Sequence, residues 1–418
     1  MKKLKQQKVF RDPIHNYIRV DDQLILNLIN TTEFQRLRRI KAMGVGNMVF
    51  HGAEHTRFQH SLGTYEIARK LIEAFKTNNS ANWDPEQTDV TLIAALLHDI
   101  GHGAYSHTFE GLFKTNHEEF SQKIILDSTT QINQVLSDYD PELPQKIADI
   151  IGHRYSNKLV VSIISSQLDV DRMDYLLRDA YYSGAEYGIY DLERILSSAI
   201  PTDNEILFDI SAMHTIEDYV LSRHQMYLQV YFHPVGRGLE VVLTSLLKRA
   251  KDIYSKSPDE KYFPENISGI FEKNIKLADY LKLDDAALTT SFGVWRNHPD
   301  QILSDLAARF LDRKPFKSIS VSGDYQEQLN KIKKNAEKNG YDPIYYVSDN
   351  EAFDLAYKIN TKNKEGVEIN FIDEDGNIIP LSESSMLVKA VADNSKASVD
   401  TRIYMPHNIY DQTKKSAD

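Results

Sequence analysis

Apolar residues recur with the spacing of an α-helix along most of the chain up to residue 311. The segment 92–97 is the most hydrophobic, because Leu92, Ile93, Leu96 and Leu97 leave almost no polar side. A helix that is apolar all round is typical of the interior of a large domain. The same period predicts further helices over 32–41, 67–75, 159–184, 217–231, 239–254 and 302–311. The pattern therefore predicts a mainly α protein with a large all-helical core.

The pattern changes after Lys314 and Pro315. Four stretches read as strands or hairpins and one as a lysine-rich amphipathic helix: strands over 318–321 and 344–348, the helix over 325–339, a hairpin over 367–383 and an edge strand over 401–405. Asp375-Gly376 supplies the residues that a tight hairpin turn favours. We therefore predict two domains, residues 1–314 and a small α/β module over 315–418. The module has no catalytic constellation, so we expect it to serve regulation or assembly.

Composition narrows the class of protein. The chain has 418 residues, 41% hydrophobic and 26% charged, which is typical of a globular protein. No apolar run approaches the ~20 residues of a membrane span, and no apolar stretch follows the basic N-terminus as in a secretory signal. The absence of cysteine excludes thiolate metal sites and fits a cytoplasmic protein. The net charge of -11 argues against a nucleic-acid partner but allows an anionic small substrate in a locally basic site.

Ionisable residues gather at the end of the hydrophobic segment 92–97. His98 and Asp99 follow it directly, and buried charge is costly unless it is paired or bound to a metal. Seven of the fourteen histidines fall between residues 51 and 117: His51, His55, His60, His98, His102, His107 and His117. Imidazole and carboxylate together suit a divalent cation. The alternative is that these are ordinary core and surface histidines without a shared role.

Two later segments carry polar faces. Within 159–184, which reads as one long helix, Asp171, Tyr175 and Asp179 are spaced i, i+4, i+8, with Arg172 adjacent. This face could be part of a site or a surface ion-pair network. The segment 217–231 repeats the spacing with its own set, Arg223, Tyr227 and Tyr231. That stripe could hold phosphate and sugar, or could simply pack with the arginine extending to solvent.

The order His60, His98-Asp99, Asp171 resembles that of the HD-domain metal-dependent phosphohydrolase superfamily. Longer segments resemble the deoxynucleoside triphosphate triphosphohydrolases within it, in the same order and over about residues 8–310: RDPIHNYI, FQRLRRIK, HTRFQHSLG, LLHDIGHGAYSHTFE, LDVDRMDYLLRDAYYSG and RHQMYLQVY. The C-terminal module resembles that of the bacterial members more loosely. The resemblance implies the fold of an all-helical HD domain.

The resemblance also implies a site and a reaction. The metal ligands would be His60, His98, Asp99 and Asp171, and the ion Mn, Mg, Fe or Zn. The reaction is hydrolysis at the α-phosphorus, which releases deoxynucleoside and intact triphosphate. Arg57, Arg172 and Arg223 would clamp the phosphates. His117, oriented by Glu110, would protonate the leaving oxygen, with His102 and His107 as alternatives. Tyr175, Asp179 and Tyr231 would meet the sugar, and Tyr227 belongs to the same stripe.

One position departs from the family pattern. After FQRLRRIK the family usually shows Gln-Leu, where the Gln helps to read a sugar hydroxyl, whereas this chain has Ala42-Met43. Losing a hydrogen-bonding group weakens discrimination between sugars. Two alternatives therefore stand beside a dNTP triphosphohydrolase: a nucleotidase or phosphodiesterase acting on another nucleoside phosphate, and a non-catalytic nucleotide sensor.

The resemblance finally implies an assembly. Family members are often homotetramers that a guanine nucleotide activates at a subunit interface. The matching positions here are Lys8, Val9, Gln35 and Arg38. We therefore expect a homo-oligomer, a tetramer or dimer, with possible allosteric activation.

Overall fold

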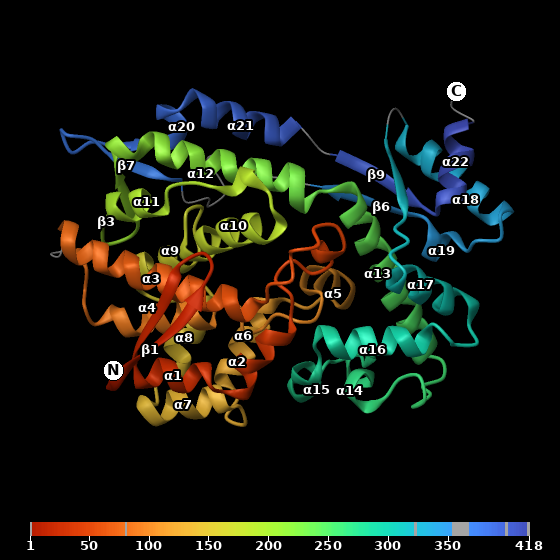
Figure 1. Cartoon of the computed structure of the whole chain (residues 1–418), viewed down its shortest axis with the longest axis horizontal. Helices are drawn as coiled ribbons and strands as arrows, with labels where there is room; N and C mark the ends of the chain where they lie inside the picture. Colours follow the sequence, from red (N-terminus) through yellow and green to blue (C-terminus); the bar gives the residue numbers. More distant parts are fainter. Residues whose placement is uncertain (1, 80–81, 322–323, 353–367, 398–399, 416–418) are drawn as a thin grey trace.

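The computed structural model describes residues 2–79, 82–321, 324–352, 368–397 and 400–415. Helices dominate and the sheets are small, which confirms the mainly α prediction (Figure 1). Besides the elements introduced below, the helices are α1 (Gln23–Ile29), α5 (Ser106–Phe113), α6 (His117–Leu126), α7 (Gln131–Tyr139), α8 (Leu143–Ile151), α11 (Leu192–Ser198), α14 (Glu265–Ser268), α15 (Leu277–Lys282), α16 (Asp285–Trp295), α17 (Gln301–Leu311), α20 (Leu381–Ser384) and α22 (His407–Lys415). Among the helices of these described ranges, none combines the length and apolar character that a bilayer crossing requires.

The centre of the molecule is a pair of packed helices, α3 (Arg57–Asn79) and α4 (Gln87–Leu97). Every residue of α4 from Val90 to Leu97 is buried, which confirms the expectation of an interior helix. The helix α10 (Val170–Ser183) packs on the other side of α3. These three helices hold the first residues of the site at their ends.

The segment 159–184 is two helices and not the single one predicted. The first, α9 (Lys158–Ile164), ends before a short non-helical stretch, and α10 begins after Asp169. The Asp169 side chain is buried and accepts from the backbone N–H groups of Ser166 (2.8 Å) and Arg172 (2.7 Å). An aspartate that satisfies free N–H groups in this way starts a new helix. As a result Asp171 lies in the first turn of α10.

The segment 32–41 is also shorter than predicted as a helix. The α-helix α2 (Thr32–Arg36) passes into a 3₁₀ turn over Leu37–Arg39, and Ile40 is extended. Thr31 caps it by accepting from the Phe34 N–H. The stripe of Phe34, Leu37 and Ile40 is fully buried all the same, so the hydrophobic period marked the buried face correctly but not the helix end.

A two-stranded hairpin precedes these helices. The strands β1 (Lys3–Asp12) and β2 (Asn16–Asp22) pair antiparallel, with Asp12 opposite Asn16 at the turn. Asn16 adopts φ = 60°, a left-handed conformation that asparagine tolerates better than most residues. Ile18 and Val20 of β2 are buried in the main core. The hairpin is therefore fixed to the helical body.

A π-helical turn interrupts the segment that bears Arg223 and the tyrosines. The α-helix α12 (Met213–Met226) continues as π-helix over Tyr227–Tyr231, and α13 (Pro234–Tyr254) follows. π-Helical turns are rare and often occur at functional sites.

The C-terminal part of the chain contributes to two sheets. One sheet has the order β3 (Ala199–Pro201), β4 (Ile206–Asp209), β7 (Asn370–Ile372), β8 (Ile378–Pro380), in which β7 and β8 form the predicted hairpin and β4 pairs parallel to β7. The helix α21 (Met386–Ala397) runs alongside α12 (Figure 1). Residues on both sides of the boundary predicted at residue 314 therefore pack against each other.

The second sheet has the order β5 (Lys317–Ser320), β9 (Asp400–Met405), β6 (Ser348–Ala352), with α18 (Tyr325–Lys338) packed nearby. The predicted edge strand over 401–405 is a strand, but it lies in the middle. The predicted strand over 344–348 is wrong, because a helical turn, α19 (Pro343–Tyr346), occupies most of it. Asp342 caps that turn by accepting from the Ile344 N–H, and Pro343 is suited to a first helical position.

Candidate metal centre

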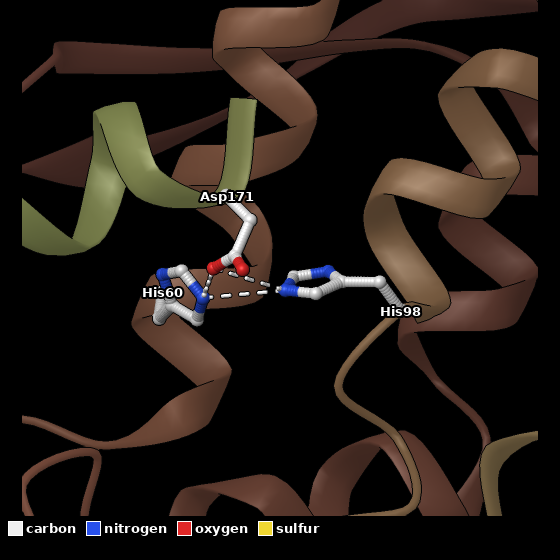
Figure 2. Close-up of side chains that lie close together, drawn as sticks. All are labelled: His60, His98 and Asp171. Atoms are coloured by element: carbon white, nitrogen blue, oxygen red, sulfur yellow. Dashed lines mark hydrogen bonds and ion pairs between the residues drawn. The ribbon is translucent and has the colours of Figure 1, made fainter. Parts of the chain in front are cut away.

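Three side chains from three helices converge at one point. His60 comes from the first turn of α3, His98 from the end of α4 and Asp171 from the first turn of α10 (Figure 2). His60 Nε2 lies 3.3 Å from His98 Nε2. Asp171 Oδ1 lies 3.0 Å from His60 Nε2 and 3.6 Å from His98 Nε2. Residues that are far apart in sequence thus present three potential ligand atoms to a single position.

The other ring nitrogens of the two histidines determine what these atoms can do. His98 Nδ1 is 2.9 Å from the Ala95 carbonyl oxygen, which can only accept, so Nδ1 carries the proton. His60 Nδ1 is 2.8 Å from Asp174 Oδ2, which favours the same tautomer. When both rings are neutral, both Nε2 atoms therefore direct lone pairs into the same space. Two lone pairs at 3.3 Å repel each other unless a cation lies between them.

The distances and charges fit a divalent ion. Donor atoms bound about 2.0–2.2 Å from one ion lie roughly 3.0–3.6 Å apart, which matches this group. Burial alone would lower the pKa of His60, but its hydrogen bonds with Asp171 and Asp174 outweigh burial and raise that pKa to about 10. The surroundings thus strongly favour positive charge at this point. A divalent ion supplies such charge while it leaves the imidazoles neutral.

Asp99 borders the same point. Its oxygens lie 3.4 Å from His98 Nε2 and 3.6 Å from His60 Nε2. Asp99 also forms an ion pair with Arg57 Nη1 at 2.5 Å and approaches His102 Nε2 at 3.1 Å. Burial would raise the pKa of Asp99, but the charges of His102, Arg57 and His98 lower it well below its usual range. Asp99 is therefore an ionised group shared between the ligand cluster and its neighbours.

The residues predicted for proton transfer form a second cluster. Glu110 accepts from His117 Nδ1 at 2.9 Å, and the rings of His117 and His102 stack at 4.0 Å. Their ligand atoms lie within 4.8 Å of one another, so this group could also hold an ion. His107 is in α5, but its side chain lies outside the described residues.

The pKa values of the two stacked histidines, His102 and His117, are shifted in opposite directions. Burial and the charge of Arg57 lower the pKa of His102 well below its usual range. Burial also disfavours the charged form of His117, but the hydrogen bond with Glu110 outweighs it and raises the pKa of His117. At neutral pH His117 is therefore the better proton carrier of the two.

A cavity of about 580 Å³ opens from the ligand cluster. This volume is typical of small-molecule sites. Residues predicted for substrate binding that line it are Arg57, Arg172, Tyr175, Asp179, Tyr227 and Tyr231, and Ala42 and Met43 line it as well. Arg223 does not contribute to the lining. Its guanidinium is buried 5.7 Å from the centre of the Tyr227 ring, and no hydrogen bond to its Nε is found within the described part of the chain.

The predicted sugar-binding carboxylate is held from two sides. Asp179 Oδ2 accepts from the Tyr231 hydroxyl at 2.7 Å, and Asp179 Oδ1 lies 2.7 Å from Nε2 of His55. The His55 ring is buried and stacks on Tyr182 at 4.5 Å. Sequence reasoning did not assign a role to His55, which contacts Asp179.

The residues predicted for an activating nucleotide lie elsewhere. Arg38 Nε donates to Gln35 Oε1 at 2.8 Å, and the Arg38 guanidinium lies 3.5 Å from the centre of the Phe58 ring. Gln35 in turn donates to the Ile29 carbonyl. Lys8 and Val9 are exposed on β1. The structure thus brings Gln35 and Arg38 together on one surface.

Comparison with known proteins identifies the family. The HD domain model matches residues 57–179, and the HD associated region model matches residues 190–418. The chain belongs to the HD-domain family. The Bacillus subtilis protein YwfO is 44% identical to it over 99% of this chain and 95% of its own length.

This HD-domain protein is also similar to one named enzyme and to one solved structure. The deoxynucleoside triphosphate triphosphohydrolase SAMHD1 of Homo sapiens is 29% identical over 66% of this chain, and the match spans 50% of that protein. A crystal structure of a phosphohydrolase from Bacteroides thetaiotaomicron superposes with a TM-score of 0.81 at 26% identity, over 96% of this chain and 99% of that one. The resemblance read from the motifs is thus confirmed at the level of the family.

Sequence reasoning missed the residues that contact the candidate metal ligand His60 from behind. Asp174 and Arg178 are fully buried on α10 and contact each other and His60 or Asp12. A signal was present, since both polar residues stand among the apolar positions Met173, Leu176 and Leu177. Charged residues at i and i+4 on the buried face of a helix indicate an interior ion pair.

Proposed function

We propose that the protein is a divalent-metal-dependent phosphohydrolase that converts deoxynucleoside triphosphates into deoxynucleoside and inorganic triphosphate. The observation that carries the proposal is the convergence of two imidazole lone pairs and Asp171 at the end of a cavity lined by arginines and tyrosines. The names of the SAMHD1 relatives and of the phosphohydrolase structure support the same reaction class.

The ion would be held by His60, His98 and Asp171, with Asp99 as the fourth ligand. When bound, it would lower the pKa of a water molecule and neutralise phosphate charge. The donor set suits Mn, Mg, Fe or Zn. Arg57 and Arg172 line the cavity and would bind phosphate oxygens, for which a guanidinium is well shaped. Arg223 would join them only after a movement of its side chain.

The reaction requires one proton transfer to the sugar. A water oxygen bonds to the α-phosphorus and releases a proton to solvent, the bond from that phosphorus to O5′ breaks, and O5′ takes a proton from a side chain that solvent then reprotonates. We assign His117 as the proton donor. Its hydrogen bond with Glu110 raises its pKa, so a larger fraction of His117 is protonated at neutral pH than of an ordinary histidine. His102 has its pKa lowered and is a weaker donor. His107 remains a further alternative.

The sugar would lie against the tyrosine side of the cavity. Asp179 would accept from a sugar hydroxyl while His55 and Tyr231 fix its two oxygens. Tyr175 and Tyr231, whose ring centres are 6.3 Å apart, would contact the faces of the sugar, and Tyr227 would extend this wall.

A second candidate rests on Ala42. This residue lines the cavity and offers no hydrogen-bonding side chain, although its backbone N–H donates to the His55 carbonyl at 3.0 Å. The wall that would read the sugar is therefore less selective, which favours a phosphohydrolase acting on other nucleoside phosphates. A non-catalytic nucleotide sensor is disfavoured by the intact donor and ligand set.

We also propose a homo-oligomer activated by a guanine nucleotide. The assigned positions are Lys8, Val9, Gln35 and Arg38, of which Gln35 and Arg38 contact each other. Kinetics and sedimentation that do not change on addition of dGTP or GTP would remove this part of the proposal without affecting the reaction.

The decisive experiment is incubation with each dNTP and NTP in the presence of Mn²⁺ or Mg²⁺, with and without dGTP, followed by chromatography of the products. Release of inorganic triphosphate from dNTPs supports the proposal. Release of orthophosphate or pyrophosphate supports the second candidate instead. Absence of any product under all conditions would favour the sensor.

A further inference from the structure

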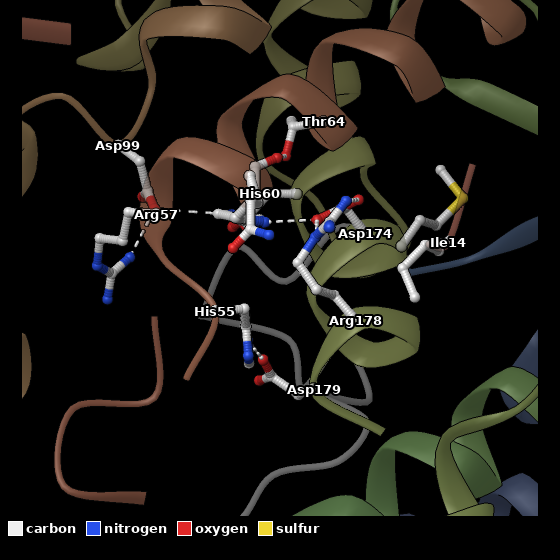
Figure 3. A network of polar contacts seen from close by, with 12 residues as sticks. Ile14, His55, Arg57, His60, Thr64, Asp99, Asp174, Arg178 and Asp179 are labelled. Carbon is white, nitrogen blue, oxygen red and sulfur yellow. Dashed lines mark hydrogen bonds and ion pairs between the residues drawn. The ribbon is translucent and has the colours of Figure 1, made fainter. Parts of the chain in front are cut away.

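A buried polar network lies directly behind the candidate ligand His60. At its centre is Asp174, whose side chain has no solvent exposure. Asp174 Oδ2 accepts from His60 Nδ1 at 2.8 Å and from Arg178 Nε at 2.8 Å. Asp174 Oδ1 accepts from Arg178 Nη2 at 2.9 Å and lies 2.7 Å from Nε2 of His15. Figure 3 shows His60, Asp174 and Arg178 in this row, with Arg57 and Asp99 on the opposite side of His60.

The network continues to the turn of the N-terminal hairpin. Arg178 Nη1 donates to Asp12 Oδ2 at 2.8 Å and Arg178 Nη2 to Asp12 Oδ1 at 3.3 Å. Asp12 Oδ1 also accepts from the backbone N–H groups of Ile14 (2.9 Å) and His15 (3.0 Å). The same carboxylate therefore shapes the turn that carries His15 and holds the arginine that supports Asp174.

Close packing leaves this network little freedom. Gly63 of α3 faces it, and a Cβ atom at this position would lie 1.8 Å from Asp174 Oδ1 and 2.4 Å from Arg178 Nη2. Any residue other than glycine would therefore displace the carboxylate. His15, Asp12, Asp174 and Arg178 are all buried. The hairpin turn, α3 and α10 thus meet through direct hydrogen bonds between buried side chains.

We propose that His15 and Asp12 are positioning residues for the metal ligand His60, so that the hairpin is part of the metal centre. The inference rests on the proposed function in that it assumes a divalent ion at His60. Both residues precede the HD domain match, which begins at residue 57. A carboxylate that accepts from the far nitrogen of a ligating imidazole fixes its tautomer and orientation. His15 donates to the other oxygen of that carboxylate, and Asp12 fixes the arginine that donates to both oxygens.

The test compares two substitutions of His15 that differ in reach. His15→Gln places an amide N–H near the position of Nε2, whereas the shorter His15→Asn does not. We would measure Mn²⁺ binding to metal-free protein by electron paramagnetic resonance and record the visible spectrum of the Co²⁺-loaded protein. The matched control is His214→Asn, because His214 also pairs with a carboxylate, Glu217, but is 85% exposed.

We expect His15→Asn to weaken Mn²⁺ binding by about 10–100-fold, the range for lost partners of a ligand, and to alter the Co²⁺ spectrum. His15→Gln should recover binding to within a few-fold of wild type, and His214→Asn should leave both readouts unchanged. Asp12→Asn should also weaken Mn²⁺ binding. If neither His15 variant folds, this variant tests the proposed positioning role.

The outcomes separate the inference from the proposed function. Wild-type protein that binds no Mn²⁺ would remove the metal site and the inference with it. If wild type binds Mn²⁺ and the folded His15→Asn or Asp12→Asn variant binds it equally well with an unchanged Co²⁺ spectrum, the inference alone is wrong. A variant that only melts earlier, with unaltered affinity, would show a purely structural role.

Discussion

Two pairs of histidines lie side by side in this protein and differ in what holds them. His60 and His98 meet edge to face, with ring planes at 81°, and each has its Nδ1 occupied by a fixed acceptor. His102 and His117 stack with planes at 13°, and their carboxylate contacts use Nε2 in one ring and Nδ1 in the other. The first arrangement aims two lone pairs at one point. The second places two rings with opposite pKa shifts next to each other.

The difference teaches how one residue type acquires two kinds of chemistry. A neutral imidazole whose far nitrogen is already donating can only accept or ligate with the other nitrogen. An imidazole that is hydrogen-bonded to a glutamate and remains 29% exposed can exchange a proton. The first pair is thus suited to hold an ion and the second to transfer a proton, and substitutions can separate the two roles.

The largest effect should come from the first pair. His98→Ala or Asp171→Ala removes a ligand from a small donor set, and we expect loss of bound metal together with a fall in kcat/KM of at least about a thousandfold. Metal content and turnover would be measured on the same preparation. Far-UV circular dichroism would verify that the variant folds. Retained activity in either variant would show that the ion is held elsewhere.

A substitution in the second pair should slow turnover and leave metal binding unchanged. His117→Ala is expected to bind Mn²⁺ like wild type while kcat falls by about 10²–10⁴-fold, the usual contribution of a general acid. Equilibrium binding and steady-state kinetics would test this together. Loss of Mn²⁺ in this variant would reassign His117 as a ligand and erase the distinction between the pairs.

A pH profile sharpens the same distinction. Glu110 raises the pKa of His117, so Glu110→Gln should lower it. A general acid must be protonated, and activity therefore falls as pH rises through its pKa. We expect the high-pH limb of kcat/KM to move to lower pH in Glu110→Gln. A limb at the wild-type position would mean that another group donates the proton.

A moderate effect is expected where the sugar would bind. His55→Ala removes a buried partner of Asp179, and we expect the preference for a nucleotide with a 3′-hydroxyl over its 3′-deoxy analogue to fall by about 10–100-fold. The ratio of kcat/KM for the two substrates is the measurement. The control is His51→Ala, because His51 is an exposed histidine four residues away. An unchanged ratio would leave His55 with a packing role only.

The smallest effect concerns stability. Asp285 accepts from the backbone N–H groups of Lys41 and Tyr105, near both walls of the cavity, and burial raises its pKa to about 6. Because its pKa is higher in the folded state, the folded protein binds the extra proton between about pH 4 and 6, and this contribution to stability is lost as pH rises through 6. Urea unfolding should therefore show Asp285→Asn gaining stability relative to wild type between pH 4.5 and 7. A pH-independent difference would contradict this.

Much of the fold and of the candidate site could be predicted, and the reasons differ by residue. The buried helix ending at His98 followed from its apolar period, and the face shared by Asp171, Tyr175 and Asp179 from helical spacing. The break before α10 could not be seen, because it depends on the buried side chain of Asp169 capping the next turn. The spacing of apolar residues does not reveal whether an aspartate within a helical pattern will cap a new helix.

Long-range pairing was the other gap. Asp174 lies three residues from Asp171, and only the fold shows that one faces the ligands while the other supports His60 through contacts with residues near the N-terminus. In the same way, the hairpin over 367–383 was recognisable, but its parallel pairing with β4 was not. The sequence identified groups with chemical capacity, and the tertiary contacts decide how each is held.

The central claim is that the first histidine pair, and not the second, holds the divalent ion. An anomalous difference map from crystals grown with Mn²⁺ tests it directly. We predict a peak within about 2.2 Å of His60 Nε2, His98 Nε2 and an oxygen of Asp171. A peak only between His102 and His117, or none at either pair, would contradict the account.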